Sequence, residues 1–260
     1  MADIRLIHGY CIEEMQKLND IDVKVDLVLT DPPYGTTSCK WDSIIPFDAM
    51  WNGIRSVIHD RTPVLLFGNE PFSSFLRTSN VECYKYDWVW NKENSANFMN
   101  AKVQPLRPLE YISVFYKKAP KYYPIRRPKT IDYDSTRTSA KDKRFRENGS
   151  EVSGGRFSRR FYIDDGTRYP INLITFNSQK DECNNVNRSH PTQKPLVLLE
   201  YLIKTYTDEG DTVLDFTMGS GSTGVACKRL GRNFIGIELD KDYYDIAVDR
   251  VNSVQSKLCS

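Results

Sequence analysis

The chain has 260 residues, of which 40% are hydrophobic and 27% are charged, so it can bury a substantial core and lacks the composition of a disordered protein. Its net charge of +2 is too small to indicate a nucleic-acid-binding protein from composition alone. No apolar run approaches the roughly 20 residues that cross a bilayer, and the first ten residues, MADIRLIHGY, lack the apolar core of a signal peptide.

The six cysteines are scattered along the chain. None forms a CxxC pair, and none combines with histidine in a spacing that binds zinc, so no metal site is predicted. Unpaired thiols in a chain of this length are typical of a reducing compartment. We therefore expect a soluble, cytoplasmic protein that does not associate with membranes. The cysteines stand at positions 11, 39, 83, 183, 227 and 259.

Short apolar runs alternate with segments of helical periodicity. The predicted strands are 4–7, 25–29, 64–67, 88–90, 112–116, 212–215 and 234–238. The predicted helices are 12–18, 47–58, 72–78, 195–206, 223–230 and 243–254. This alternation predicts an α/β fold with a mostly parallel, doubly wound sheet, in which ligands bind beyond the carboxyl ends of the strands.

One such strand end carries the sequence Asp31-Pro32-Pro33-Tyr34. The two prolines fix the backbone and remove two N–H donors, so the carbonyl oxygens of this turn remain available as acceptors. Asp31 adds a carboxylate, and Tyr34 adds a flat aromatic ring. Acceptors beside an aromatic ring suit a planar substrate that carries an amino group, although Asp-Pro is also common in ordinary turns.

The middle of the chain is strongly basic. Residues 117–168 contain 15 Lys and Arg against 7 Asp and Glu, a local charge of +8, so the remainder carries −6. Seven Phe or Tyr residues lie among these charges. Basic residues interleaved with aromatic ones fit contacts with a nucleic-acid backbone, and a solvated charged loop is the alternative. We expect an inserted module here.

Near the other end, a predicted strand leads into a glycine-rich turn. Gly219, Gly221 and Gly224 match the pattern GxGxxG, and Glu238 ends the next predicted strand. Glycines at such a turn allow a ligand to approach the backbone, and the carboxylate can accept hydrogen bonds from ribose hydroxyls. The pattern indicates a cofactor that contains a nucleoside.

Glycine-rich turns have two other common uses. A phosphate-binding P-loop requires Gly-Lys-Ser/Thr, whereas Val225 and Ala226 follow Gly224. A nucleotide-dependent dehydrogenase normally begins with this turn, and here only 36 residues follow Gly224. The dehydrogenase stays open as an alternative of a different class.

Taken together, three motifs resemble the β class of amino-methyltransferases that act on DNA. Residues 31–34 resemble the catalytic motif, residues 213–224 resemble the S-adenosylmethionine (AdoMet) motif, and residues 190–195, HPTQKP, resemble the segment that precedes it. The resemblance covers nearly the whole chain outside roughly 118–168. It implies a Rossmann-like AdoMet-dependent methyltransferase fold with a circularly permuted motif order. The implied parts are a catalytic half at 1–117, a basic target-recognition insertion at 118–189 and an AdoMet-binding half at 190–260.

The resemblance also implies roles for individual residues. Asp31 and the Pro32 carbonyl group would accept hydrogen bonds from the target amino group, Pro33 would hold the turn, and Tyr34 would stack on the flipped base. Thr217 and Gly9-Tyr10 stand where the family usually has Phe and Gly-Asp. The residues implied in AdoMet binding are Cys11, Asp31, Thr192, Lys194, Asp215, Phe216, Gly219, Ser220, Gly221, Ser222 and Glu238.

Double-stranded DNA is the expected partner, and a homodimer is possible in such a family. Most contacts from the basic segment would reach phosphates and carry no sequence information. The predicted DNA-binding residues are Lys40, Arg107, Arg126, Arg127, Lys143, Arg144, Arg156 and Arg159.

The resemblance thus implies a site-specific DNA methyltransferase, of the kind found in restriction–modification, that flips its target base and methylates N6 of adenine directly. Asp at the start of the catalytic motif favours adenine by the habit of the family. N4 of cytosine is the alternative, because the same acceptors suit either amine. A DNA-binding regulator without activity would not require residues 31–34.

Overall fold

The computed structural model describes residues 2–35, 43–93, 98–129, 166–177 and 193–254. The chain divides into two compact units, one made of Met1–Tyr123 with Asn172–Ser260 and the other of Pro124–Ile171. Thr192, Lys40, Lys143, Arg144, Arg156 and Arg159 lie outside the described residues.

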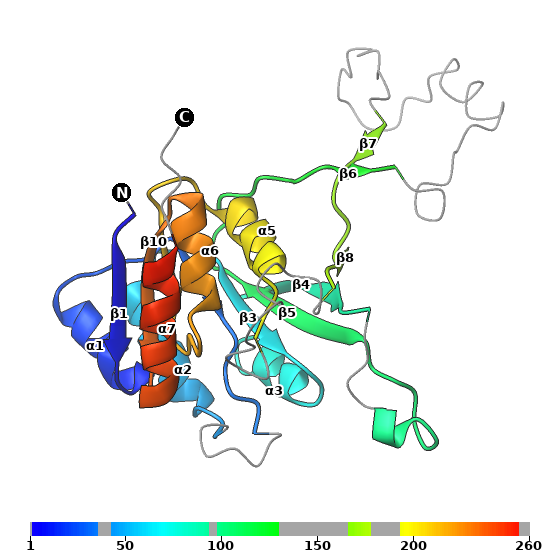
Figure 1. Cartoon of the computed structure of the whole chain (residues 1–260), viewed down its shortest axis with the longest axis horizontal. Helices are drawn as coiled ribbons and strands as arrows, with labels where there is room; N and C mark the ends of the chain where they lie inside the picture. Colours follow the sequence, from blue (N-terminus) through cyan, green and yellow to red (C-terminus); the bar gives the residue numbers. More distant parts are fainter. Residues whose placement is uncertain (1, 36–42, 94–97, 130–165, 178–192, 255–260) are drawn as a thin grey trace. The chain divides into compact units, whose positions relative to one another are not determined.

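The larger unit is built on an eight-stranded sheet of order β1-β10-β9-β2-β3-β5-β4-β8 (Figure 1). All neighbouring strands described in it are parallel except the two pairs that β5 makes, with β3 and with β4. The prediction of a mostly parallel α/β sheet is therefore confirmed. The strands are β1 Ile4–His8, β2 Leu27–Thr30, β3 Val64–Gly68, β4 Tyr84–Asn91, β5 Leu109–Phe115, β8 Leu173–Thr175, β9 Thr212–Asp215 and β10 Asn233–Glu238.

All seven predicted strands occur, the one at 212–215 with the predicted ends and the others with shifted ends, and β8 was not predicted. The strand predicted at 25–29 begins as a regular strand only at Leu27, because Val25 instead forms an isolated bridge with Ile58. The same bridge ends the neighbouring helix at Val57, one residue earlier than predicted. β8 escaped prediction because three residues are too few for a periodic pattern.

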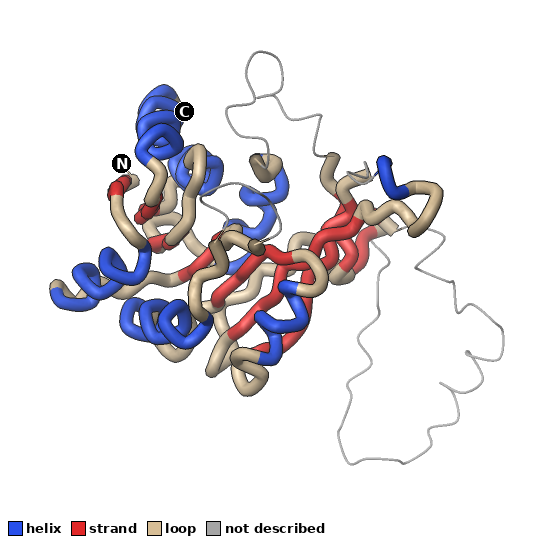
Figure 2. The backbone as a smooth tube through the Cα atoms, turned by 90° about the horizontal axis from the view of Figure 1, so that it is seen from below, coloured by secondary structure: helices blue, strands red, loops and turns tan. Residues whose placement is uncertain are grey.

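Helices cover both faces of the sheet (Figure 2). α1, α2 and α3 contribute buried side chains to one hydrophobic cluster, and α5, α6 and α7 contribute to another on the opposite face. The alternation along β2 shows why: Leu27 and Leu29 belong to one cluster and Val28 to the other. The helices are α1 Cys11–Asp20, α2 Phe47–Val57, α3 Phe72–Thr78, α5 Leu196–Tyr206, α6 Ser222–Leu230 and α7 Lys241–Ser253.

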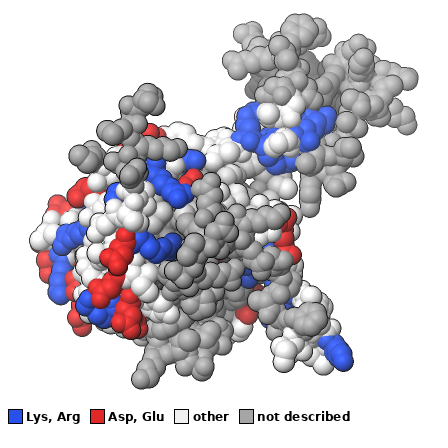
Figure 3. Space-filling view, viewed as in Figure 1, with Lys and Arg blue, Asp and Glu red and all other residues white. Residues whose placement is uncertain are grey.

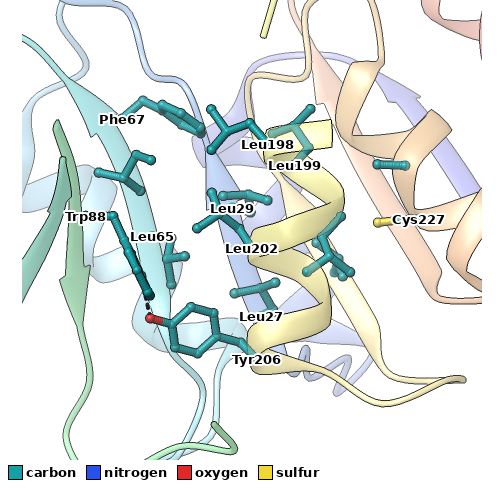
Figure 4. Packing of buried hydrophobic residues seen from close by; sticks show 14 of the residues in the cluster. Leu27, Leu29, Leu65, Phe67, Trp88, Leu198, Leu199, Leu202, Tyr206 and Cys227 are labelled. Atoms are coloured by element: carbon teal, nitrogen blue, oxygen red, sulfur yellow. Dashed lines mark hydrogen bonds between the residues drawn. The ribbon is translucent and has the colours of Figure 1, made fainter. Parts of the chain in front are cut away.

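Helix α5 packs its apolar side chains onto the middle of the sheet. Leu198, Leu199 and Leu202 are almost completely buried there, facing the side chains of the central strands (Figure 4). At the end of the helix, the Tyr206 hydroxyl accepts a hydrogen bond of 2.8 Å from Trp88 Nε1. This packing fixes the position of the helix and of the residues that lead into it.

The carboxyl ends of β2, β3, β9 and β10 lie at one edge of the sheet because these strands are parallel. β5 runs the other way, so its first residues lie at the same edge. Gly68, the last residue of β3, pairs with Tyr111, and Trp90 near the end of β4 pairs with Glu110. This edge therefore combines the last residues of parallel strands with the first residues of an antiparallel one.

The smaller unit contains a short antiparallel pair, β6 Arg127–Pro128 with β7 Thr167–Arg168. Arg126 Nε donates a hydrogen bond of 2.5 Å to Thr167 Oγ1, and its guanidinium lies 5.1 Å from the centre of the Tyr169 ring. Lys and Arg atoms gather on the described part of this unit in Figure 3. The unit lies within the predicted 118–189 segment, whose role in target recognition stays a prediction.

None of the helices in the described residues is long and apolar enough to cross a membrane.

Candidate active site

The predicted catalytic turn directly follows β2. Asp31 Oδ2 accepts a hydrogen bond of 2.6 Å from Lys194 Nζ, and Asp31 Oδ1 accepts one from the hydroxyl of Tyr34. The Tyr34 ring packs against the ring of Phe72 with centroids 5.0 Å apart. Both carboxylate oxygens of Asp31 therefore already have a donor from the chain itself.

A buried carboxylate that the sequence analysis missed completes this cluster. Glu110 on β5 forms an ion pair of 2.8 Å with Lys194 and one of 3.2 Å with Lys92. Its Oε1 also lies 3.3 Å from the Tyr34 hydroxyl. A charged residue among the largely apolar residues 109–115 was the available signal, because such a residue is rarely buried without partners.

The charges of this cluster shift one another's pKa values. Burial raises the pKa of Asp31, and the nearby Lys194 charge offsets only part of that increase. For Glu110 the balance is reversed: burial acts to raise the pKa, but the two lysines outweigh it and hold the pKa below its usual range. Burial alone would lower the pKa of Lys194, yet the two carboxylates raise it above its usual range. Lys194 is therefore firmly protonated at neutral pH.

The glycine-rich turn lies beside this cluster because β9 pairs with β2. Thr217 Oγ1 donates a hydrogen bond of 3.1 Å to the backbone oxygen of Asp31, and the backbone N–H of Phe216 donates one of 3.1 Å to Thr30 Oγ1. These bonds join the two predicted halves of the site at one sheet edge.

Glu238 closes the other side of the turn. Its carboxylate accepts hydrogen bonds of 2.8 Å from the backbone N–H groups of Gly219 and Asp240. Burial raises the pKa of this side chain, while the backbone donors oppose the increase. Each oxygen retains a further lone pair that can accept a hydrogen bond from a ligand hydroxyl.

Glycine is required at two positions of the turn for different physical reasons. Gly219 has φ +53°, and a Cβ atom there would meet nothing within 4 Å, so this backbone faces open space. Gly221 has φ +77°, and a Cβ atom there would lie 2.9 Å from the Cβ of Ala247 on α7. Gly219 thus leaves room for a ligand, whereas Gly221 permits close packing of the helices.

The donors and acceptors at this edge fit AdoMet, the cofactor expected from the sequence. Glu238 offers an acceptor for ribose hydroxyls, Gly219 leaves open space, and Lys194 offers a cation for a carboxylate. Glu238 is the last residue of β10, and Asp31 directly follows β2. Because β9 lies between these two strands, the backbones of Glu238 and Asp31 are about 10 Å apart.

Three residues predicted to bind the cofactor have side chains that are engaged elsewhere. Asp215 is buried and accepts hydrogen bonds from Thr30 Oγ1 at 3.0 Å and Thr223 Oγ1 at 2.7 Å, and burial raises its pKa to about 7. Phe216 is packed within a hydrophobic cluster. The Ser220 hydroxyl accepts a hydrogen bond of 2.6 Å from Arg250. Asp215 therefore ties β2, β9 and α6 together.

Two more predicted residues flank this group. Ser222 begins α6 and lies 3.4 Å from the guanidinium of Arg250. Cys11 begins α1, and burial raises the pKa of its thiol to about 12. This thiol is protonated at neutral pH, so it is not a nucleophile. Their roles toward the cofactor stay predictions.

The predicted DNA-binding residues within the described part of the chain fall in two places. Arg107 is exposed on the segment between β4 and β5, where it donates a hydrogen bond of 3.2 Å to Gln104. Because that segment connects strand ends at the edge described above, Arg107 lies on the same side of the sheet as Asp31. Arg126 and Arg127 belong to the smaller unit.

Comparison with known proteins identifies relatives over the whole chain. Residues 25–249 match the DNA methylase family N6_N4_Mtase. The chain is 27% identical to the type II methyltransferase M1.MboII of Moraxella bovis, with 99% of each chain covered. It is also 27% identical to M.HpaI of Haemophilus parainfluenzae, covering 96% of this chain and 75% of that one.

Solved structures show the same architecture. The complex of M1.HpyAVI with SAM (AdoMet) has a TM-score of 0.64 and 26% identity, covering 96% of this chain and 99% of that one. The cytosine-N4-specific PvuII DNA methyltransferase has a TM-score of 0.66 and 14% identity, covering 100% and 89%. The second likeness concerns the fold alone. These relatives favour a methyltransferase over a dehydrogenase.

Proposed function

Because the chain belongs to the DNA methylase family, we propose that it transfers a methyl group from AdoMet to N6 of adenine at a specific site in double-stranded DNA. The observation that carries this proposal is the hydrogen bond between Thr217 and Asp31, which holds the acceptor turn beside the glycine-rich turn. A methyl acceptor at Asp31 and a nucleoside cofactor at Gly219 would then share one edge of the sheet.

The acceptor turn would activate the target amine. The lone pair of an adenine N6 is delocalised into the ring, so this nitrogen is a weak nucleophile. The carboxylate of Asp31 and the carbonyl oxygen of Pro32 would accept hydrogen bonds from its two N–H groups, which favours a pyramidal nitrogen with a free lone pair. The same oxygens would stabilise the positive charge that develops on the nitrogen.

The bound cofactor supplies a methyl group on a positively charged sulfur. Holding the target amine in line with that group can lower the barrier by roughly 7–11 kcal/mol. After transfer, the nitrogen must lose one proton. Asp31 is the nearest carboxylate in this arrangement and, because burial raises its pKa, it is a better proton acceptor than an exposed aspartate.

The remaining site residues would bind the two substrates. Glu238 would accept hydrogen bonds from the ribose, and Lys194 would lie near the methionine end of the cofactor. Tyr34 would stack on the base after it leaves the duplex. Unstacking costs a few kcal/mol, and stacking on an aromatic ring returns about 1–3 kcal/mol.

The choice of adenine rests on Asp31 at the start of the catalytic motif, and N4 of cytosine is the second candidate because the same acceptors suit either amine. Purified protein should be incubated with unmethylated plasmid DNA and AdoMet, and the DNA then digested to nucleosides. We expect N6-methyldeoxyadenosine by mass spectrometry. N4-methyldeoxycytidine would replace the adenine proposal, and the absence of both would refute methylation of DNA amines.

Binding separates this proposal from a dehydrogenase. Calorimetry should detect AdoMet binding and no NAD binding. Association of two copies into a dimer stays a prediction, which sedimentation of the same preparation would test.

A further inference from the structure

Glu110 is the buried carboxylate to which the proposed mechanism assigns no task. Its side chain is only 5% exposed, and its contacts connect it to the candidate site: Lys194 at 2.8 Å, Lys92 at 3.2 Å and the Tyr34 hydroxyl at 3.3 Å. Burying a charge requires compensation by partners. Glu110 therefore contributes to the arrangement of the site more than to the hydrophobic packing around β5.

Lys194 is shared between two carboxylates. Its ammonium nitrogen lies 2.6 Å from Asp31 Oδ2 and 2.8 Å from Glu110 Oε1, and 4.9 Å from the centre of the Phe67 ring. The side chain is 11% exposed. The start of α5, which packs onto the sheet, limits how far Lys194 can move.

The contacts of Asp31 create a conflict with its proposed task. Both oxygens already accept from donors of the chain, Tyr34 and Lys194. A target amino group must compete with these two donors for Asp31. If Lys194 released Asp31 and no other anion were present, the buried ammonium group of Lys194 would have no partner. Leaving a buried charge unpaired is strongly unfavourable.

We infer that Glu110 is a positioning residue that retains Lys194, and the hydroxyl of Tyr34, while Asp31 turns its carboxylate to the target amine. Glu110 Oε1 is already within ion-pair distance of Lys194 and faces the Tyr34 hydroxyl, so neither donor has to move far. The cluster has two carboxylates and two ammonium groups, so it stays neutral during this exchange. This inference rests on the proposed role of Asp31.

The test compares three variants with the wild-type protein. Glu110→Gln removes the second partner of Lys194. The double variant K92M/E110Q also removes this partner but keeps the net charge of the cluster at zero. It replaces the single variant in the test if the single variant does not fold. Glu82→Gln is the matched control, because it makes the same chemical change at an exposed position outside the site. Each is assayed with unmethylated plasmid DNA and labelled AdoMet, and the affinity for AdoMet is measured separately by calorimetry.

We expect both Glu110 variants to lower kcat by about 10- to 100-fold, the scale of a small misplacement of reacting groups. The Kd for AdoMet should change much less than kcat. Glu82→Gln should behave as wild type. A double variant that folds and has wild-type kcat would overturn the inference, as would a loss of activity explained entirely by weaker AdoMet binding.

The pH dependence gives a readout that a purely structural role would not change. Burial is the largest cause of the raised pKa of Asp31, and the charge of Glu110 adds to it. Glu110→Gln removes the charge of Glu110 and so lowers the pKa of Asp31. The acid limb of the pH profile of kcat/KM should therefore move to lower pH. A limb at the wild-type position would contradict the inference. The other ionisable groups around Asp31 are Lys92, Lys194, Tyr34 and Asp215.

Failure of the proposed function is distinguishable from failure of this inference. If wild-type protein methylates no DNA amine, the proposed function is wrong. If wild type is active and both Glu110 variants match the Glu82→Gln control, the proposed function stands and the inference is wrong.

Discussion

The hydroxyl of Thr217 donates a hydrogen bond of 3.1 Å to the backbone oxygen of Asp31, although 186 residues separate the two in the chain. The bond joins the turn after β2 to the turn after β9. The bond links the side chain of Thr217 to the backbone of Asp31, so the acceptor turn cannot shift along β2 without disturbing the glycine-rich turn.

Asp31→Asn should lower the rate of methyl transfer by about 10²–10³-fold while leaving AdoMet bound. The amide has nearly the same shape, but it lacks the negative charge that stabilises the developing cation, and removing one such group typically lowers kcat by about 10²–10³-fold. Glu110 remains as the partner of Lys194, so the fold should survive. Methyl transfer and AdoMet calorimetry on the same preparation check this, and full turnover by the variant would contradict the role of Asp31.

Alanine at the two glycines of the turn should have different effects. Gly221→Ala places a Cβ atom 2.9 Å from Ala247 Cβ, and such overpacking usually lowers the free energy of unfolding by about 1–3 kcal/mol, in addition to about 1–2 kcal/mol of left-handed backbone strain. Gly219→Ala has space for its Cβ atom, at the cost of about 1–2 kcal/mol of left-handed backbone strain, and its methyl group enters the proposed cofactor space. Thermal unfolding should show a lower Tm than wild type for both variants. AdoMet affinity, measured where both are folded, should fall chiefly for Gly219→Ala.

Asp215 should make stability depend on pH. Burial raises its pKa from 3.8 to about 7 in the folded protein, so the folded state binds the proton more tightly than the unfolded state. Its contribution is fully present below pH 3.8 and is lost as pH rises through about 7. The loss is at most about 4 kcal/mol. Asp215→Asn should remove this pH-dependent part of the free energy of unfolding. Denaturant unfolding of the wild type and the variant between pH 4 and 8 measures it. If the free energy of unfolding depended on pH in the same way in both proteins, the prediction would be contradicted.

Replacing Arg126 and Arg127 together by Ala should weaken DNA binding on all sequences alike. Phosphate contacts carry no sequence information, and each one lost reduces the slope of log K against log salt by about 1. Binding of labelled duplex DNA at several salt concentrations measures this slope. A wild-type affinity that does not change between low and moderate salt would argue against backbone contact by this basic unit. The double variant Lys17→Ala/Lys24→Ala removes the same number of positive charges from the larger unit and is the matched control.

Much of the fold could be predicted because its signals are local. The strand β3 is a continuous apolar run, and the segment after β9 combines glycines with a helix start, so both are readable without knowing what lies beside them. Placement of Asp31 and Gly219 at strand ends followed from the same reading. The general rule for open α/β sheets then predicted that they share an edge.

The part of the site that could not be predicted depends on strand order. Glu110 reaches Lys194 only because β5 runs antiparallel between β3 and β4, which brings the start of that strand to the edge where its neighbours end. Nothing in the local pattern of residues 109–115 reveals this reversal. The sequence also could not separate a glycine that leaves room for a ligand, Gly219, from one that packs against a helix, Gly221.

The reversed direction of β5 has a consequence for how much the neighbouring loop can vary. Hydrogen bonding to β3 on one side and β4 on the other holds the start of β5 in place, whatever the intervening chain does. The closure entropy of a loop rises only slowly with its length, by about 0.6 kcal/mol for each doubling. The connection after Lys92, which itself pairs with Glu110, can therefore be lengthened, shortened or replaced to meet a different duplex surface without moving the carboxylate of Glu110. Surface variation and internal geometry are mechanically separate at this point of the fold.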